Sequence, residues 1–152
     1  LEARVDDGVI AALIAADALA YQLGVTLLSL LDPLGIGDLS AADADEVDPQ
    51  SVFLWTEEDG RVVAFLRIIP AGIVCAEASV GRVLVDAGYR RRGLCRRLMH
   101  EALRHIARTW GPQPVRISAQ EYLVGFYASL GFEAVSGTYL EAGIPHVSML
   151  RR

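Results

Sequence analysis

Lysine is absent from the 152 residues of this chain, so all 14 of its basic residues other than histidine are arginines. This absence excludes Schiff-base chemistry on a lysine side chain and phosphate binding by a Walker-type lysine. Acidic residues outnumber basic ones, which gives a net charge of −5 and a pI near 5.1. Non-specific binding to nucleic acid needs a dominant basic surface, so we expect no nucleic-acid partner.

Cysteine is also scarce. Cys75 and Cys95 are too few for a disulfide framework and lack the spacing of metal ligands. We interpret both as small buried hydrophobes in a reducing compartment, the cytoplasm. The three histidines, His100, His105 and His146, are not grouped with carboxylates or thiols as a metal site would require. We therefore expect no metal.

One long apolar run covers residues 8–31. A membrane span is disfavoured because Asp17 would lie in mid-span, at a cost of about 2.5–3.5 kcal/mol on insertion scales. A signal peptide is disfavoured because Asp6 and Asp7 stand where a basic segment is needed. We predict a buried helix over residues 7–21 and no membrane partner, with an apolar segment of undecided structure after it.

The rest of the chain predicts one α/β domain spanning residues 1–152. Its length and its 53% content of hydrophobic residues suit a single packed core. A hairpin followed by crossover connections predicts a mixed sheet with helices on both faces. The expected strands are Val52–Thr56, Arg61–Ile69, Val80–Asp86, Val115–Ala119, Phe132–Val135 and Val147–Leu150, and the expected helices are Gly93–Arg108 and Glu121–Leu130, the latter capped by Gly131.

The segment from Val80 to Arg108 carries the clearest functional signal. A strand passes through an arginine-rich loop into the start of a helix, where unpaired backbone N–H groups and the helix dipole favour phosphate or pyrophosphate. Gly93 would let the backbone approach such an anion closely. The alternative is a solvated, arginine-rich start of a surface helix. The cationic residues concerned are Arg90, Arg91, Arg92, Arg96 and Arg97.

Two segments together resemble the GNAT superfamily of N-acetyltransferases. Arg90–Cys95 is similar to the family's R/Q-x-x-G-x-G/A acetyl-CoA loop, and Val83–Val85 to the strand before it. Gln120–Phe132 is similar to the family's Asn-x(5–6)-Tyr-x-x-x-Gly-Phe helix. Within the superfamily, Ala119-Gln120 and Gly143–His146 resemble the ElaA-type branch. The resemblance covers about residues 61–150.

This resemblance implies a mostly antiparallel twisted sheet and acetyl-CoA as co-substrate. Tyr127 would lie near the sulfur of coenzyme A and act as general acid, since a phenol with a pKa near 10 is protonated at neutral pH. A core aromatic is the alternative role for Tyr127. The cofactor-binding residues that the resemblance implies are Val83, Leu84, Val85, Arg90, Arg91, Arg92, Gly93, Leu94, Cys95, Gln120 and Phe126.

The chain departs from the family pattern at three places. Cys95 stands where the family has Gly or Ala, and Gln120 stands where many members have Asn. The segment 18–25, which corresponds to part of the acceptor side in the ElaA-type branch, lacks that branch's arginine and glutamate.

The resemblance implies an acetyl-CoA-dependent N-acetyltransferase that acts on a primary amine of a small molecule or peptide. The alternative is a non-catalytic acyl-CoA-binding or regulatory module. Glu77 and His146 are both candidates for the base that receives the amine proton. An exposed edge strand near the C-terminus could pair with a second copy and form a homodimer.

Overall fold

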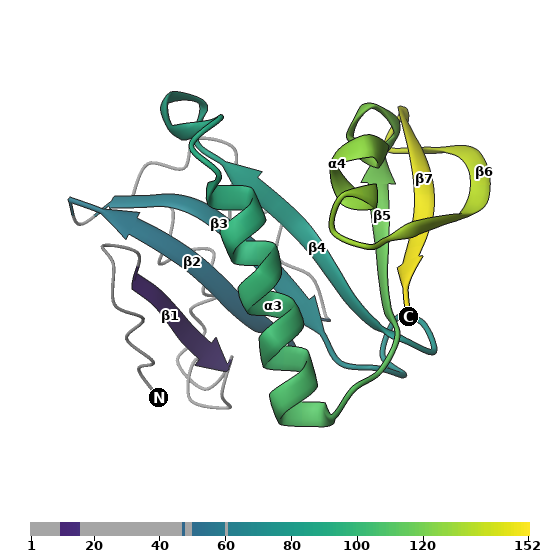
Figure 1. Ribbon diagram of the computed structural model, residues 1–152, viewed down its shortest axis with the longest axis horizontal. Coiled ribbons are helices and arrows are strands. Elements are labelled where there is room, and N and C mark those ends of the chain that lie inside the picture. Colours follow the sequence, from purple (N-terminus) through teal and green to yellow (C-terminus); the bar gives the residue numbers. More distant parts are fainter. Residues whose placement is uncertain (1–9, 16–46, 48–49, 60) are drawn as a thin grey trace.

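The computed structural model describes residues 10–15, 47, 50–59 and 61–152. They form one seven-stranded sheet in the order β1-β2-β3-β4-β5-β7-β6, and α3 and α4 pack on one of its faces (Figure 1). The elements are β1 (Ile10–Ala15), β2 (Val52–Glu58), β3 (Arg61–Ile69), β4 (Ala78–Val85), η4 (Ala87–Tyr89), α3 (Leu94–Trp110), β5 (Val115–Gln120), η5 (Glu121–Leu123), α4 (Val124–Ala128), β6 (Glu133–Glu141) and β7 (Ile144–Arg151).

The sheet is mixed and mostly antiparallel, as predicted. Every neighbouring pair of strands is antiparallel except β4 and β5, which are parallel and joined through α3. The predicted hairpin is present as β2 and β3, with a turn at Asp59, which has a positive φ of 52°. From β2 to β7 the order of the elements is the predicted one.

The helix predicted over residues 7–21 is wrong where the structure describes it. Ile10–Ala15 is a strand that pairs antiparallel with β2, with Ile10 opposite Glu57 and Ala15 opposite Val52. Six apolar residues cannot be assigned to helix or strand by periodicity. The Ala- and Leu-rich composition favours a helix. Helix propensity, however, takes no account of the edge of β2, which provides hydrogen-bond partners for the backbone of this segment. The rest of that prediction lies outside the described residues.

The main core lies between the sheet and α3. The buried positions of α3 follow the predicted apolar stripe, with Leu98, Met99, Ala102 and Ile106 facing the sheet. On β5, Val115, Ile117 and Ala119 point into the same cluster, while the residues between them point to the opposite face. This alternation is that of a strand with one face on the core, and it fixes which side chains of β5 reach the opposite face.

The second face of β2 and β3 is buried as well. Phe53 and Phe65 stack there, with ring centroids 5.5 Å apart and both side chains fully buried. Arg67 lies on this same face, 9% exposed. Both described α-helices lie on the opposite face, that of the main core. The prediction of helices on both faces of the sheet therefore concerns, for this second face, residues outside the described part of the chain.

The C-terminal third differs from the prediction in its boundaries. The predicted helix Glu121–Leu130 is split into η5 and α4, and Gly131, with φ of 88°, ends it as predicted. Strands β6 and β7 are longer than expected because a two-residue turn joins them. Its residues, Ala142 and Gly143, both have positive φ, the combination that type I′ hairpins need. Alanine gives little signal for such a turn, so the sequence did not reveal it.

The helices in the described part of the chain are too short or too polar to cross a bilayer. Strand β6 forms one edge of the sheet, and all nine of its residues are exposed. The predicted homodimer would use this edge, and it stays a prediction.

Candidate functional site

Strands β4 and β5 form a fork. They pair only at their first residues, Ala78 with Val115 and Ser79 with Arg116. Beyond these two pairs the strands separate, and their carboxyl ends lie well apart (Figure 1). The backbone of β4 past Ser79 therefore has no ladder partner on the β5 side among the described residues. Unpaired strand edges bind extended ligands through main-chain hydrogen bonds.

A bulge in β4 lies at this fork. Phe65 pairs with Leu84 and Arg67 pairs with Gly81, so two residues of β4 oppose one residue of β3. Arg82, one of those two residues, has a φ of 49°, in the left-handed region. A bulge of this kind bends the strand and redirects the residues after it. Of the predicted cofactor residues, Val83 is the second residue of the bulge and Leu84 and Val85 follow it; all three are half-buried.

The loop after β4 leads into an uncapped helix start. Asp86 closes the first turn, accepting a hydrogen bond from Gly88 N at 2.8 Å. Gly93 is the N-cap of α3 with φ of 77°, and no side chain of the described part caps the helix. The first hydrogen bond of α3 runs from Arg97 N to Gly93 O at 3.1 Å. The amides of the first turn, those of Leu94, Cys95 and Arg96, come before that bond, so they are donors for an anion.

The five arginines of this segment have different surroundings. Arg90 Nε donates to Val85 O at 3.2 Å. Arg92 lies 3.6 Å from a carboxylate oxygen of Glu58, and its guanidinium stacks over the ring of Tyr89. The guanidinium groups of Arg91 and Arg97 have no partner among the described residues, and the contacts of Arg96 are with α4. The cationic field that the sequence predicted therefore rests most on Arg91 and Arg97.

Arg96 joins the start of α3 to α4. Its Nη2 donates to Ser129 Oγ at 2.9 Å, and its guanidinium lies over the ring of Phe126, 5.4 Å from the centroid. Ser129 Oγ in turn donates to Phe126 O at 2.6 Å. Phe126 contacts Tyr127 edge to face at 5.1 Å. The loop that the sequence assigned to phosphate and the predicted catalytic tyrosine are therefore in one contact network.

Tyr127 is 6% exposed and packs between Phe126 and Phe132. Burial, with smaller contributions from Cys95 and Tyr122, raises the pKa of Tyr127 above its usual value. Its hydroxyl makes no hydrogen bond to a described residue, yet it is not fully occluded. A buried tyrosine usually has a hydrogen-bond partner. The Tyr127 hydroxyl is thus a protonated donor that is free for a ligand.

Cys95 lies in the first turn of α3 and is half-buried against the core. Burial raises the pKa of its thiol to about 11, and the nearby charge of Arg96 opposes this only in part. The helix start would lower a thiol pKa, but burial wins here. The thiol is therefore neutral at physiological pH. The group of Cys95 that can bind an anion is its backbone amide.

Two further predicted cofactor residues lie close by. Gln120 is the last residue of β5 and half-buried on the face opposite α3. Phe126 belongs to α4 and packs against the main core together with Leu94. Five of the predicted residues pack against the same core, namely Val83, Val85, Leu94, Cys95 and Phe126. Gln120 faces the opposite side of the sheet.

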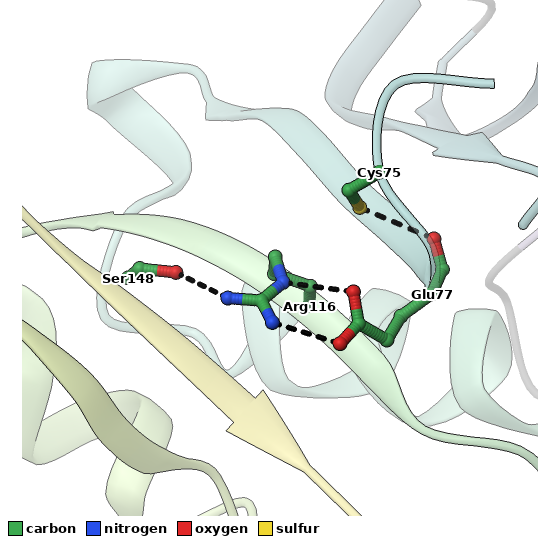
Figure 2. A network of polar contacts seen from close by, with 4 residues as sticks. All are labelled: Cys75, Glu77, Arg116 and Ser148. Atoms are coloured by element: carbon green, nitrogen blue, oxygen red, sulfur yellow. Dashed lines mark hydrogen bonds and ion pairs between the residues drawn. The ribbon is translucent and has the colours of Figure 1, made fainter. Parts of the chain in front are cut away.

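The closed end of the fork is held by an ion pair (Figure 2). Arg116 donates two hydrogen bonds to the Glu77 carboxylate, at 3.0 and 2.8 Å, and a third to Ser148 Oγ at 3.0 Å. The hydrogen bonds from Arg116 lower the pKa of Glu77 to about 2. They likewise raise the pKa of Arg116. A carboxylate so stabilised is a poor proton acceptor, which argues against Glu77 as the base.

His146, the other candidate base, is buried on the face opposite α3. Its Nδ1 lies 2.8 Å from Ile144 O. A carbonyl oxygen only accepts, so Nδ1 carries a hydrogen, which leaves Nε2 of the neutral ring as the acceptor. The ring of Tyr139 stacks on it at 6.3 Å. In the described part of the chain no group of three or more His, Cys, Asp or Glu side chains could hold a metal ion.

Sequence reasoning missed a polar cluster on this same face, formed by Ser118, Tyr139 and Glu141. Ser118 Oγ lies 2.6 Å from Tyr139 Oη and 2.6 Å from Glu141 Oε2. The three residues come from β5 and β6, which are separated in the sheet by β7. No spacing in the sequence signals such a contact, because the residues are 21 and 23 positions apart.

Comparisons with known proteins agree with this geometry. Residues 38–152 match the model of the acetyltransferase (GNAT) domain. The chain belongs to the GNAT family of acetyltransferases.

Its similarity is to the ElaA branch of that family. It is 32% identical to protein ElaA of Escherichia coli over 111 residues, covering 72% of this chain and 71% of ElaA. It is 37% identical to a UPF0039 protein of Schizosaccharomyces pombe over 109 residues, covering 70% of this chain and 71% of the relative. An acyl-CoA N-acyltransferase from Pseudomonas aeruginosa has the same fold, with a TM-score of 0.77 and 29% identity, covering 95% of this chain and 99% of that one.

Proposed function

We propose that this protein is an N-acetyltransferase that transfers an acetyl group from acetyl-CoA to a primary amine. The observation that carries the proposal is the fork between β4 and β5, together with the uncapped start of α3 that follows β4. Arg96 and Phe126 link this helix start to Tyr127. Family membership and the solved acyl-CoA N-acyltransferase support it.

The coenzyme would lie along the open end of the fork. Its pyrophosphate would accept hydrogen bonds from the amides that begin α3, reinforced by the helix dipole and by Arg91 and Arg97. Gly93 leaves room there, since a Cβ added to it would meet nothing within 4 Å. The extended pantetheine arm would pair with the free edge of β4 at Val83–Val85. The reacting thioester would then reach the region of Tyr127.

The chemistry is attack of a neutral amine nitrogen on the thioester carbon. A C–N bond forms and the C–S bond breaks. The departing sulfur takes a proton from the Tyr127 hydroxyl. The attacking amine loses a proton in turn, and this proton restores the Tyr127 phenol. The raised pKa of Tyr127 keeps the phenol protonated, so it is a hydrogen-bond donor to the developing thiolate. The fold contributes mainly by holding both reactants together.

The test is calorimetric titration of acetyl-CoA into the wild type and into Gly93→Asp and Gly93→Asn. Asp and Asn tolerate the left-handed backbone of Gly93 about equally, so the pair differs only in charge. We expect Gly93→Asp to lose about 100-fold in affinity and Gly93→Asn to lose much less. Equal affinity of both variants would refute the pyrophosphate assignment.

Turnover separates the proposed enzyme from the alternative, a non-catalytic acyl-CoA-binding module. The free thiol of coenzyme A released in the presence of a panel of primary amines measures it directly. Tight binding of acetyl-CoA without release of thiol for any amine would favour the module. Since both cysteines of the described chain are free thiols, we place the protein in the reducing cytoplasm.

A further inference from the structure

The cluster of Ser118, Tyr139 and Glu141 lies on the exposed face of the sheet, opposite α3. All three side chains reach solvent, with Tyr139 37% exposed. Tyr139 and Glu141 lean across β7 to meet Ser118 on β5. This contact across an intervening strand holds three polar side chains in one place, where a ligand can reach them.

The hydrogens of the cluster are all used within it. Glu141 is a carboxylate and only accepts, so the single hydroxyl hydrogen of Ser118 points to it. The contact between Ser118 and Tyr139 must then use the hydrogen of the tyrosine. What remains toward solvent is a set of acceptor lone pairs together with one negative charge. A ligand that fits this set donates hydrogen bonds and is cationic.

The position of Ser118 places the cluster beside the fork. The last pair between β4 and β5 is Ser79 with Arg116, and Ser118 follows two residues later, where β5 has lost its β4 partner. Ile117 and Ala119 point into the core under α3, so Ser118 points to the other face. An acyl group that enters the fork from the side of α3 would thus be reached by an acceptor from the side of this cluster.

The charges around the cluster leave that of Glu141 uncompensated. The Glu77 carboxylate is neutralised by Arg116, which lies on the same face as Ser118. Arg67 lies on the same face, but on β3, which β4 separates from β5. The Arg67 side chain already interacts with another group. His146 lies under the ring of Tyr139, with Nδ1 on the carbonyl of Ile144. Glu141 itself has no cationic partner among the described residues.

We propose that Ser118, Tyr139 and Glu141 form the acceptor subsite and select an amine that carries a second, cationic amino group. This inference rests on the proposed acetyltransferase function. Glu141 binds the charged amino group, and Ser118 and Tyr139 fix the orientation of its carboxylate. The other amino group, in its neutral form, reaches the thioester at the fork.

The experiment compares three acceptors of equal chain length: 1,4-diaminobutane, 1-aminobutane and 4-aminobutanoate. They differ in whether the distal group is cationic, neutral or anionic. We expect kcat/KM to fall in that order, with the diamine favoured about tenfold over the monoamine. In Glu141→Gln, which keeps the hydrogen bond from Ser118, this preference should disappear through a higher KM for the diamine. Glu133→Gln, a matched change on the same strand, should keep it.

A second readout does not depend on turnover. Chemical shifts of the protein with coenzyme A present report binding of the diamine, which we expect for the wild type and not for Glu141→Gln. A preference for the diamine that is unchanged in Glu141→Gln overturns the subsite, as does the absence of Glu141-dependent binding. Binding of the diamine without acetylation of any amine would instead contradict the proposed function and leave the cationic subsite supported.

Discussion

The two ends of the β4–β5 pair differ in how their polar groups are satisfied. At the closed end, Arg116 saturates the Glu77 carboxylate and bonds Ser148 as well. At the open end, the amides that begin α3 and the hydroxyl of Tyr127 are without partners among the described residues. The closed end fixes where the strands meet, and the open end keeps its donors for a ligand. Unpaired donors near the surface are therefore the better guide to the site than strong internal pairs.

The largest expected effect concerns the open end. Tyr127→Phe should lower kcat about 100-fold, because it removes the hydrogen that stabilises the departing thiolate. The hydroxyl makes no hydrogen bond to a residue that the structure describes, so folding and affinity for acetyl-CoA should stay near those of the wild type. Steady-state kinetics with calorimetry measure both. A wild-type kcat in this variant would leave Tyr127 as a core aromatic only.

The thiol of Cys95 tests how far burial controls the open end. In a Cys75→Ser background, where Cys95 alone reacts, alkylation should accelerate about tenfold per pH unit from pH 7 until it levels off near pH 11. The raised pKa has this sign because burial disfavours the thiolate. The urea-unfolded protein is the control and should level off near pH 8.5. A plateau near pH 8.5 in the folded protein would show that the helix start outweighs burial.

Arg96 tests whether the two halves of the open end act together. Arg96→Gln should lower kcat about threefold to tenfold, since it removes the bond to Ser129 and the contact with Phe126 that hold α4 against α3. Arg97→Gln removes the same charge from the next position, whose guanidinium makes no hydrogen bond or ion pair with a described residue. It should change KM for acetyl-CoA similarly and leave kcat unchanged. Equal kcat values in both variants would show that Arg96 contributes only charge.

The smallest expected effect on activity is at the closed end. Glu77→Gln should leave the affinity for acetyl-CoA unchanged and lower the thermal midpoint at pH 7. The folded-state pKa of about 2 lies below the ordinary value of 4.5, so the stabilisation is present above pH 4.5 and is lost as the pH falls toward 2. Melting curves of wild type and variant should therefore converge near pH 2. Curves that stay apart there would mean that the side chain stabilises the fold by something other than its charge.

The sequence predicted best where the determining contacts are local. The apolar stripe of α3, the hairpin before it and the cap at Gly131 all follow from residues a few positions apart. The candidate site followed because its loop and helix are consecutive in the chain. The β1 strand was missed because its pairing with β2 joins residues about 40 positions apart, from Ala15–Val52 to Ile10–Glu57. The cluster around Ser118 was missed for the same reason.

Sequence by itself determined the family, the mixed sheet and the position of the loop that leads into α3, because each of these depends on motifs or on periodicity within short segments. Tertiary structure alone decided three things: that Ile10–Ala15 is a strand, that Arg116 neutralises Glu77, and that Ser118 meets Tyr139 and Glu141 over β7. The physical reason is that the partner of a backbone edge or a side-chain charge is chosen by strand order and register. Those are properties of the whole sheet, which no single segment of the chain contains.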